Sequence, residues 1–150
     1  MWIFEGKEFN PSPDEMQWEG FVYEIYDTAN GMKYIGKKNF WSVRRLKPLK
    51  GKTRRRVQKK ESDWRKYHGS NEKIIQLVEE SDPSRWKRTI LRLCRSKGEM
   101  SYWEAKLQFD KNVLFDPKYY NEFIGLKIHS KHVASISEEM LNDTKGNTSS

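Results

Sequence analysis

Two tyrosines, Tyr23 and Tyr34, stand on either side of an Asn30-Gly31 pair and directly before a strongly basic stretch of the chain. The Asn-Gly pair predicts a tight hairpin turn, because both of its positions accept positive φ. The two phenols then belong to one small hairpin. Phenols on a strand usually only pack, but a phenol beside a phosphate-binding surface can take part in proton transfer. The spacing therefore predicts a candidate site for phosphate chemistry at this hairpin.

The register of the hairpin decides how close the two phenols come. A two-residue loop would pair Asp27 with Tyr34 and would place Tyr23 on the same face as Tyr34, roughly 13 Å away along the strands. A three-residue loop would send the two side chains to opposite faces. The hairpin alone therefore does not bring the phenols together.

The basic stretch, residues 37–66, holds 14 of the 29 lysines and arginines and only two acids, which gives a local charge of +12. The other residues carry 15 basic and 19 acidic side chains, or −4. So local an excess is typical of a surface that binds a polyanion, most often nucleic acid, whereas a merely solvated loop mixes the two signs. The predicted DNA contacts are Lys38, Lys50, Lys52, Arg54, Arg55, Arg56, Lys59 and Lys60.

The composition predicts one soluble domain with a modest, aromatic-rich core, since the chain has 150 residues and is 35% hydrophobic. Cys94 is the single cysteine, so we expect neither a disulfide framework nor a cysteine-rich zinc site. No apolar run approaches the ~20 residues of a membrane span, and the N-terminus lacks a signal-peptide layout. We expect a cytoplasmic protein that does not bind membranes.

The order of elements predicts a small α/β (α+β) fold. Strands are expected over residues 20–28, 32–37 and 86–95, the last with Thr89, Leu91 and Leu93 facing the core. A short helix is expected over 40–46 and another after Ser70, ending at Asp82-Pro83. Ser96 and Glu99 form a capping box that opens a helix of about 15 residues.

The composition also divides the chain into three parts. Residues 1–18 are predicted to form an irregular arm that packs its aromatic side chains on the domain. The domain itself spans residues 19–132 and includes a basic segment at about 46–62. Residues 133–150 form a polar tail that is expected to fray.

The helix after Ser96 carries the most informative acidic residue. Met100, Trp103 and Leu107 form its apolar stripe, and helical geometry places Glu104 within that stripe. A carboxylate there is costly unless it is paired or binds a metal. One reading is a pair with an arginine; the other is a ligand for one Mg²⁺ ion, which takes one or two carboxylates and completes its shell with water and phosphate.

Taken in order, Tyr23, Tyr34-Ile35-Gly36, Arg44, Glu104 and Asn121 resemble the motifs of the GIY-YIG nuclease superfamily. The resemblance covers about residues 20–128. Ser62-Asp63-Trp64 and Tyr67-His68-Gly69-Ser70 make the chain similar to small phage-encoded members related to homing endonucleases. The first motif reads Phe-Val-Tyr here, and the basic segment at about 46–62 resembles an insertion relative to a minimal domain of this family. The resemblance implies a three-stranded antiparallel sheet flanked by helices, and hydrolysis of DNA phosphodiesters with one divalent metal.

The resemblance also implies a role for each matching residue. Tyr23 and Tyr34 would flank the attacking water, and neighbouring cations would have to lower a phenol pKa for it to act as base. Arg44 would stabilise charge on the phosphoryl oxygens. Glu104 would hold Mg²⁺, with Mn²⁺ as a substitute. Asn121 would support the site by hydrogen bonding.

Several alternatives stay open. Arg45 stands next to Arg44, and Lys37 and His68 are further catalytic candidates. A zinc site at His129 and His132 is not expected, because they lack cysteine or carboxylate neighbours. A non-catalytic nucleic-acid-binding protein would show the same basic patch. The sequence does not give the cleavage specificity, the biological role or the number of strands cut, and a dimer on DNA would be one route to double-strand cleavage.

Overall fold

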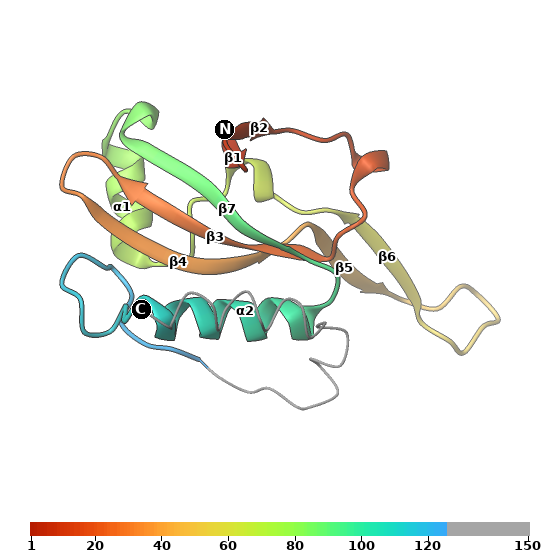
Figure 1. Cartoon of the computed structure of the whole chain (residues 1–150). Helices are drawn as coiled ribbons and strands as arrows, with labels where there is room; N and C mark the ends of the chain where they lie inside the picture. The colour runs from red at the N-terminus through yellow and green to blue at the C-terminus, as the bar shows by residue number, and fades with distance from the viewer. Residues whose placement is uncertain (126–150) are drawn as a thin grey trace.

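The fold was analysed in a computed structural model that describes residues 1–125 (Figure 1). The predicted tail, the C-terminal end of the predicted domain and both His129 and His132 lie outside the described residues. The strands are β1 (Trp2–Phe4), β2 (Lys7–Phe9), β3 (Gly20–Asp27), β4 (Met32–Asn39), β5 (Trp41–Leu46), β6 (Arg56–Glu61) and β7 (Trp86–Cys94). The helices are α1 (Glu72–Glu80) and α2 (Lys97–Asp110), with 3-10 turns η1 (Pro13–Glu15), η2 (Trp64–Lys66) and η3 (Pro83–Arg85).

The main sheet has five strands in the order β2-β1-β7-β3-β4, so the predicted mixed α and β class is confirmed but the sheet is larger than the predicted three strands. The predicted antiparallel core is β7-β3-β4. The additional strands come from the N-terminal segment, which was expected to be irregular. Its residues 2–4 pair parallel with β7, and β2 folds back on β1. Strands of three residues give too short a period to be read from sequence.

The β3–β4 hairpin differs from the predicted register. Its loop spans residues 28–31, and the Gly31 amide donates to the Asp27 carbonyl at 2.8 Å. Gly31 alone of the Asn-Gly pair has positive φ, at 75°. Asp27 therefore pairs with Met32, and Tyr23 lies opposite Gly36. That register halves the predicted offset between the two tyrosines, because Tyr34 is only two residues from the partner of Tyr23.

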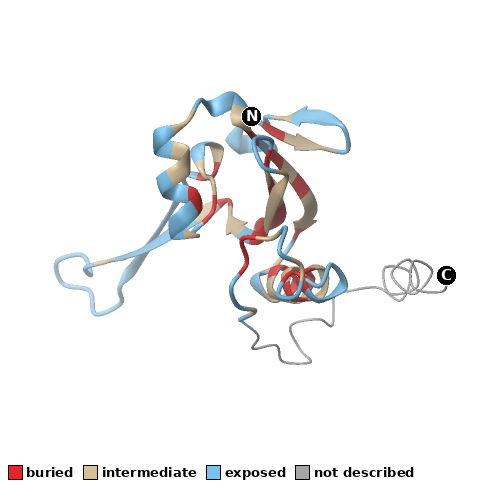
Figure 2. Ribbon diagram, turned by 90° about the vertical axis from the view of Figure 1, so that its left-hand side faces the viewer, coloured by how far each residue is buried: buried red, intermediate tan, exposed pale blue. Residues whose placement is uncertain are grey.

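The expected helix over residues 40–46 is wrong: this segment is strand β5, which pairs antiparallel with β6 to form a separate two-stranded ribbon. A strand is favoured because each side chain of β5 has a cross-strand neighbour on β6, for which the sequence predicted no strand. The ribbon projects from the body of the molecule (Figures 1 and 2). All of residues 47–60 are exposed. The expectation that residues 38–68 contribute no core element is nevertheless wrong, because Phe40 and Trp64 are buried in the core.

Buried residues form two clusters, one on each face of the main sheet, and Figure 2 marks buried residues along the strands and α2. Helix α2 covers one face, where Met100 and Trp103 pack on Val22 and Ile35. The other face packs against the N-terminal segment, η2 and α1. The core on this face includes the large buried side chains of Trp2, Phe21, Tyr23, Phe40, Trp64 and Ile74. Strands β3 and β4 are therefore packed on both of their faces.

Strand β7 presents a different face to this second core than predicted. Trp86, Arg88 and Ile90 are buried, whereas Thr89, Leu91 and Leu93 were expected to face inward. A bulge between Val22 and Tyr23 shifts the register of the β3–β7 pair. The side chains of β7 therefore do not alternate regularly between the two faces, as the prediction assumed. Arg88 can be buried because its guanidinium donates to the carbonyls of Arg65 and Tyr67 and stacks on the Trp2 ring.

The helix ends follow the expected chemistry with one change. Ser96 caps α2 by accepting from the Glu99 amide at 3.1 Å, as predicted. Helix α1 is capped by Asn71, which accepts from the Ile74 amide at 3.1 Å, and not by Ser70. No helix within residues 1–125 is long and apolar enough to cross a bilayer.

Candidate active site

Two tyrosine rings from neighbouring strands meet on one face of the sheet. Tyr23 comes from β3 and Tyr34 from β4, and their ring centroids are 6.3 Å apart. The ring of Tyr67, just after η2, meets Tyr23 edge-on at 5.9 Å, and these two phenols share a hydrogen bond. Tyr23 is only 1% exposed, whereas Tyr34 is partly exposed. The site therefore has one buried phenol and one that solvent reaches.

Two glycines make room for the phenols. A β-carbon on Gly36 would lie 2.5 Å from the Tyr23 hydroxyl and 3.0 Å from a ring carbon of Tyr34. A β-carbon on Gly69 would lie 3.3 Å from the same hydroxyl, and Gly69 has a φ of +94°. Gly36 is thus needed for close approach, and Gly69 for both its conformation and its lack of a side chain.

The phenol pKa values move in the direction opposite to the one predicted. Burial raises the pKa of Tyr23 well above its usual value, and the neighbouring Tyr67 and Tyr34 raise it further. Burial also raises the pKa of Tyr34, although a hydrogen bond with Ser70 lowers it in part. The expected lowering by Lys37 and Arg44 is therefore wrong for the protein alone, because desolvation dominates at both rings.

Glu104 lies in the apolar face of α2, as predicted. Met100 and Trp103 beside it are buried, and the Glu104 side chain is only 15% exposed. Its carboxylate lies 3.8 Å from the Lys37 ammonium, which also donates to the Ser101 hydroxyl at 2.9 Å. The partner is thus a lysine and not the arginine considered from sequence.

Burial raises the pKa of Glu104, and Lys37 lowers it only in part. The charge of Glu104 is also close enough to raise the pKa values of Tyr23 and Tyr34. The carboxylate, both phenols and the lysine therefore form one electrostatically connected cluster.

The residues around Glu104 fit a hard divalent cation better than zinc. Within residues 1–125 no three His, Cys, Asp or Glu side chains gather as a metal cage. A single partly buried carboxylate, destabilised by burial and held by one distant lysine, matches the ligand set of Mg²⁺, which keeps several waters and takes substrate phosphate.

Asn121 holds the strand between Tyr34 and Gly36. Its side-chain oxygen accepts from the Ile35 amide at 3.1 Å and its amide nitrogen donates to the Ile35 carbonyl at 2.9 Å. Gln108 of α2 donates to the same carbonyl at 2.9 Å. Asn121 is buried. The structure therefore places it behind the tyrosines, as a support for the backbone of β4.

A buried polar cluster anchors the segment that carries Asn121. Asp27 is fully buried and accepts from the Arg85 guanidinium at 2.7 and 2.9 Å and from the Tyr120 hydroxyl at 2.7 Å. Asn30 donates to the same hydroxyl. Burial alone would raise the pKa of Asp27, but these hydrogen bonds outweigh it and lower the pKa. The cluster fixes the hairpin turn to Tyr120, next to Asn121.

Three predicted residues are not brought to the phenols. Arg44 and Arg45 are exposed on β5, and neither guanidinium makes a hydrogen bond or ion pair within residues 1–125. The Nδ1 atom of His68 lies 2.9 Å from the Lys66 carbonyl, and burial lowers the pKa of this imidazole. His68 thus contacts the backbone of its own loop.

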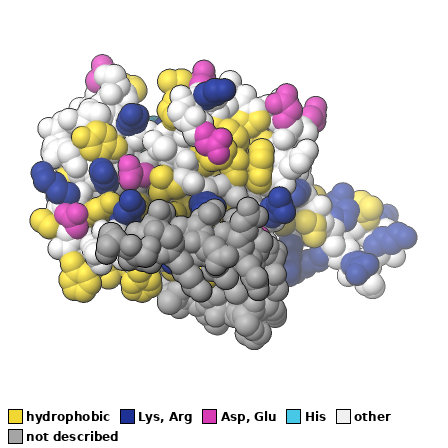
Figure 3. Space-filling view, viewed as in Figure 1, with side chains coloured by type: hydrophobic (Ala, Val, Ile, Leu, Met, Phe, Trp, Pro, Cys, Tyr) yellow, Lys and Arg dark blue, Asp and Glu magenta, His cyan; other side chains and the backbone are white. Residues whose placement is uncertain are grey.

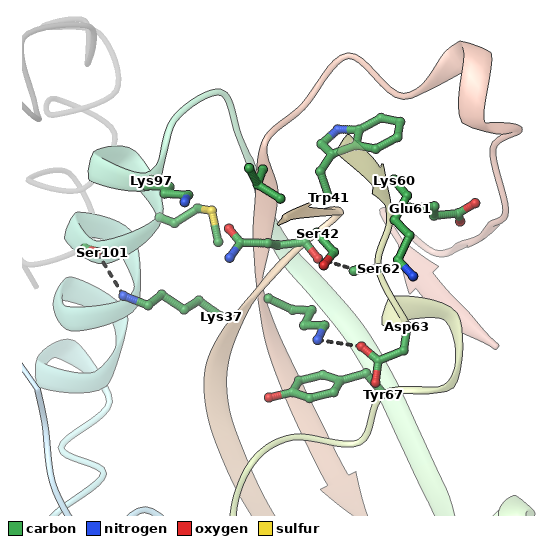
Figure 4. Close-up of a pocket in the computed structure, with 14 residues that line it drawn as sticks. Lys37, Trp41, Ser42, Lys60, Glu61, Ser62, Asp63, Tyr67, Lys97 and Ser101 are labelled. Carbon is green, nitrogen blue, oxygen red and sulfur yellow. Dashed lines mark hydrogen bonds and ion pairs between the residues drawn. The ribbon is translucent and has the colours of Figure 1, made fainter. Parts of the chain in front are cut away.

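A groove of about 1060 Å³ is lined by Lys37 and Tyr67 (Figure 4), which are the neighbours of Glu104 and Tyr23 respectively. Ser101, which bonds the Lys37 ammonium, also lines the groove. The groove runs past the start of α2 to the base of the β5–β6 ribbon. Its cationic residues are Lys37, Lys38, Lys60 and Lys97. Lys38 is held by Asp63 at 2.6 Å and lies over the Tyr67 ring at 4.1 Å. The groove is therefore suited to an anionic chain that passes the phenols.

The β5–β6 ribbon extends the basic surface beyond the groove. Figure 3 shows Lys and Arg side chains gathered along it, at the right of the molecule. Its exposed basic residues include seven of the eight predicted DNA contacts: Lys50, Lys52, Arg54, Arg55, Arg56, Lys59 and Lys60. The eighth, Lys38, lies in the groove.

Sequence reasoning missed three contributors to this site. Tyr67 and Gly69 were noted only as part of a motif, without a part in the phenol cluster. Gln108 looked like an ordinary helical residue, although its spacing of four from Glu104 places it on the same face of α2. That spacing was the one signal that could have identified it.

The fold and the site define a small α+β domain that places two tyrosines and a carboxylate beside a basic groove. The family model described as "Putative endonuclease segE, GIY-YIG domain" matches residues 2–124. The chain therefore belongs to this family of GIY-YIG endonuclease domains. The match includes the N-terminal strands β1 and β2. Neither the curated proteins nor the solved structures gave a match.

Proposed function

We propose that the protein is a divalent-metal-dependent DNA endonuclease whose active site is the cluster of Tyr23, Tyr34, Lys37 and Glu104. The observation that carries this proposal is the partly buried carboxylate of Glu104, which lies beside Lys37, influences the pKa values of both phenols and adjoins a groove that Lys37 and Tyr67 line. Burial of this carboxylate is unfavourable, and the ammonium and the backbone amide of Lys37 compensate only in part.

The groove binds the DNA backbone. Lys37, Lys38, Lys60 and Lys97 attract the phosphates, and the side chains of the ribbon continue this contact away from the site. Binding in the groove brings one phosphate next to Lys37 and the phenols. Affinity for DNA should therefore fall steeply with salt concentration. Each neutralised phosphate should contribute about −0.9 to the slope of log affinity against log salt concentration.

The chemistry is hydrolysis of one phosphodiester bond. The oxygen of a water molecule attacks phosphorus, one of its protons passes to the phenolate oxygen of Tyr34, and the bond from phosphorus to the leaving oxygen breaks, with the leaving oxygen taking a proton from solvent water. Tyr34 is the better candidate for the base because it is partly exposed, whereas Tyr23 is buried and bonded to Tyr67. Tyr23 and Gly36 position the Tyr34 ring, and Lys37 stabilises charge on the phosphoryl oxygens.

Glu104 would hold a Mg²⁺ or Mn²⁺ ion, which supplies Lewis-acid polarisation of the phosphate. Asn121 and Gln108 keep the Tyr34-Ile35-Gly36 backbone in place through Ile35. One active site cuts one strand, so a double-strand break would need either two copies on the DNA or two successive nicks.

The test is nicking of supercoiled plasmid by the full chain with Mg²⁺ or Mn²⁺ at low salt. Glu104→Ala should lower the rate about 100-fold or more while leaving binding to duplex DNA, measured by fluorescence anisotropy in EDTA, largely intact. Glu79→Ala, an exposed glutamate on α1, is the matched control and should keep full activity.

A different result would favour a different class of protein. If the wild-type chain leaves supercoiled, linear and single-stranded DNA uncut with either metal but still binds DNA, the protein is a nucleic-acid-binding module without catalysis.

A further inference from the structure

The β5–β6 ribbon has two chemically different faces. Cross-strand partners share a face, and alternate residues along each strand point to opposite sides. One face carries the pairs Ser42–Lys60, Arg44–Gln58 and Leu46–Arg56. The other carries Trp41–Glu61, Val43–Lys59 and Arg45–Val57. We call them the Gln58 face and the Trp41 face.

The Trp41 face is attached to the body of the protein. The Trp41 indole donates to the Trp18 carbonyl at 3.2 Å, and Lys59 lies over the Trp41 ring at 5.0 Å. Glu61 accepts from Trp64 at 2.8 Å and from Arg65 at 2.6 Å. These contacts fix the base of the ribbon on this side.

The Gln58 face offers hydrogen-bonding groups that the protein does not use. Arg44 and Gln58 lie directly opposite each other and are exposed, and their side chains make no hydrogen bond or ion pair within the described part of the chain. The side chain of Arg56 is likewise exposed and has no partner there. At the base of the ribbon, Ser42 and Lys60 of this face line the groove, together with Trp41, Val43 and Glu61 of the other face. The Gln58 face thus borders the proposed path of the DNA.

The dimensions and chemistry of this face suit the major groove of duplex DNA. That groove is about 12 Å wide and admits a two-stranded ribbon, whereas the minor groove is about 6 Å wide. Six residues of strand span roughly 20 Å. An arginine can donate twice to guanine O6 and N7, and a glutamine side chain can bond adenine N6 and N7. A purely electrostatic contact would need no glutamine opposite the arginine.

We propose that the β5–β6 ribbon enters the major groove of duplex DNA with the Gln58 face towards the bases, and that Gln58 and Arg44 recognise base edges there. This inference rests on the proposed function, because it takes the groove as the path of the DNA. It gives Arg44 a role in base recognition in place of the catalytic role predicted from sequence. It also supplies a source of cleavage preference within the described domain.

The groove that is occupied can be identified by dimethyl sulfate footprinting. This reagent methylates guanine N7 in the major groove and adenine N3 in the minor groove. The probe is a duplex isolated from a randomised DNA pool by binding to the full chain in EDTA, so that no cleavage is required. We expect protection of guanine N7, and protection confined to adenine N3 would overturn the proposal.

The residues that recognise bases can be identified by repeating the selection with variants. Gln58→Ala should lose preference at one base position, where discrimination falls by about 5- to 100-fold. Gln76→Ala, an exposed glutamine on α1 outside the ribbon, is the matched control and should leave the preferred sequence unchanged. Circular dichroism would verify that both variants are folded.

Three results would contradict the proposal: no selected sequence for the wild-type chain, the same sequence for Gln58→Ala, or the same loss of preference produced by Gln76→Ala. Failure of the nuclease function is separate from these outcomes. A chain that never cuts DNA but shows a preference that depends on Gln58 would overturn the proposed function and keep this inference. A nuclease without guanine N7 protection would do the reverse.

Discussion

The hydroxyl of Tyr23 lies where a side chain on Gly36 would have to begin. The two residues are directly opposite each other on β3 and β4, and the distance from the Tyr23 oxygen to an ideal β-carbon on Gly36 is 2.5 Å. Real β-carbons essentially never come this close to another atom. The glycine of the Tyr-Ile-Gly motif is therefore explained by the packing of the Tyr23 phenol.

We expect Gly36→Ala to displace the Tyr23 ring and, through it, Tyr34. The extra methyl group must push a buried ring, so unfolding should become easier by about 1–3 kcal/mol. A shift of about 1 Å at the phenols should lower the nicking rate by up to roughly 100-fold. Denaturant unfolding and plasmid nicking measure the two effects.

Gly125→Ala is the matched control for this substitution, because no atom of residues 1–125 lies within 4 Å of its β-carbon. It should leave both the free energy of unfolding and the nicking rate unchanged. A Gly36→Ala variant with wild-type stability and activity would mean that the phenols do not need this close contact.

We expect the charged Glu104 carboxylate to reduce the stability of the fold, although the proposed cleavage reaction requires it. Burial raises its pKa, so the fold favours the protonated carboxyl over the charged one. The stabilising contribution of such a group is present below its unfolded pKa of about 4.3 and is lost as the pH rises through the higher folded value. At pH 7 the carboxylate is charged in a partly buried position, which is unfavourable.

We therefore expect Glu104→Gln to raise the free energy of unfolding at pH 7 by about 0.5–2 kcal/mol, even though it abolishes nicking. The gain should shrink as the pH falls toward 4, because the wild-type carboxyl then becomes neutral too. Thermal unfolding at several pH values measures this. The exposed Glu79→Gln should change stability by less than about 0.5 kcal/mol. A Glu104→Gln variant less stable than wild type at pH 7 would show that the Lys37 pair outweighs burial.

The sequence was sufficient to predict the parts of the site that depend on one element. The position of Glu104 follows from helical periodicity after the Ser96 cap, and the antiparallel strands 20–28, 32–37 and 86–95 follow from their β-branched and aromatic residues. The position of Tyr23 relative to Tyr34 did not follow, because it depends on whether the loop has two or four residues. An Asn-Gly pair fits both lengths, and the Asp27 cluster that selects the longer loop involves Arg85 and Tyr120, far away in sequence.

The ribbon shows a second limit of sequence reasoning. Residues 41–46 look like part of a solvated basic loop or a short helix, since their strand pairing depends on residues 56–61. A two-stranded ribbon with few buried side chains carries little of the hydrophobic periodicity from which strands are predicted. The charge of this region was predictable, whereas the separation of its side chains onto two faces was not.

The identity of the base can be tested by the dependence of the cleavage rate on pH. Burial raises the pKa of Tyr34 above its usual value, so the phenolate that accepts the proton is scarce at neutral pH and becomes more abundant as the pH rises. We expect log kcat/KM to increase with a slope of about +1 from pH 6 into the alkaline range.

Tyr34→Phe should lower the rate by about 100- to 10,000-fold and remove the slope. Tyr23→Phe should lower the rate but keep the slope, because the buried Tyr23 positions Tyr34 without taking the proton. Tyr26→Phe, on the same hairpin, should behave like wild type. If the slope is lost with Tyr23→Phe and kept with Tyr34→Phe, the two tyrosines have exchanged roles, and the buried phenol is the base.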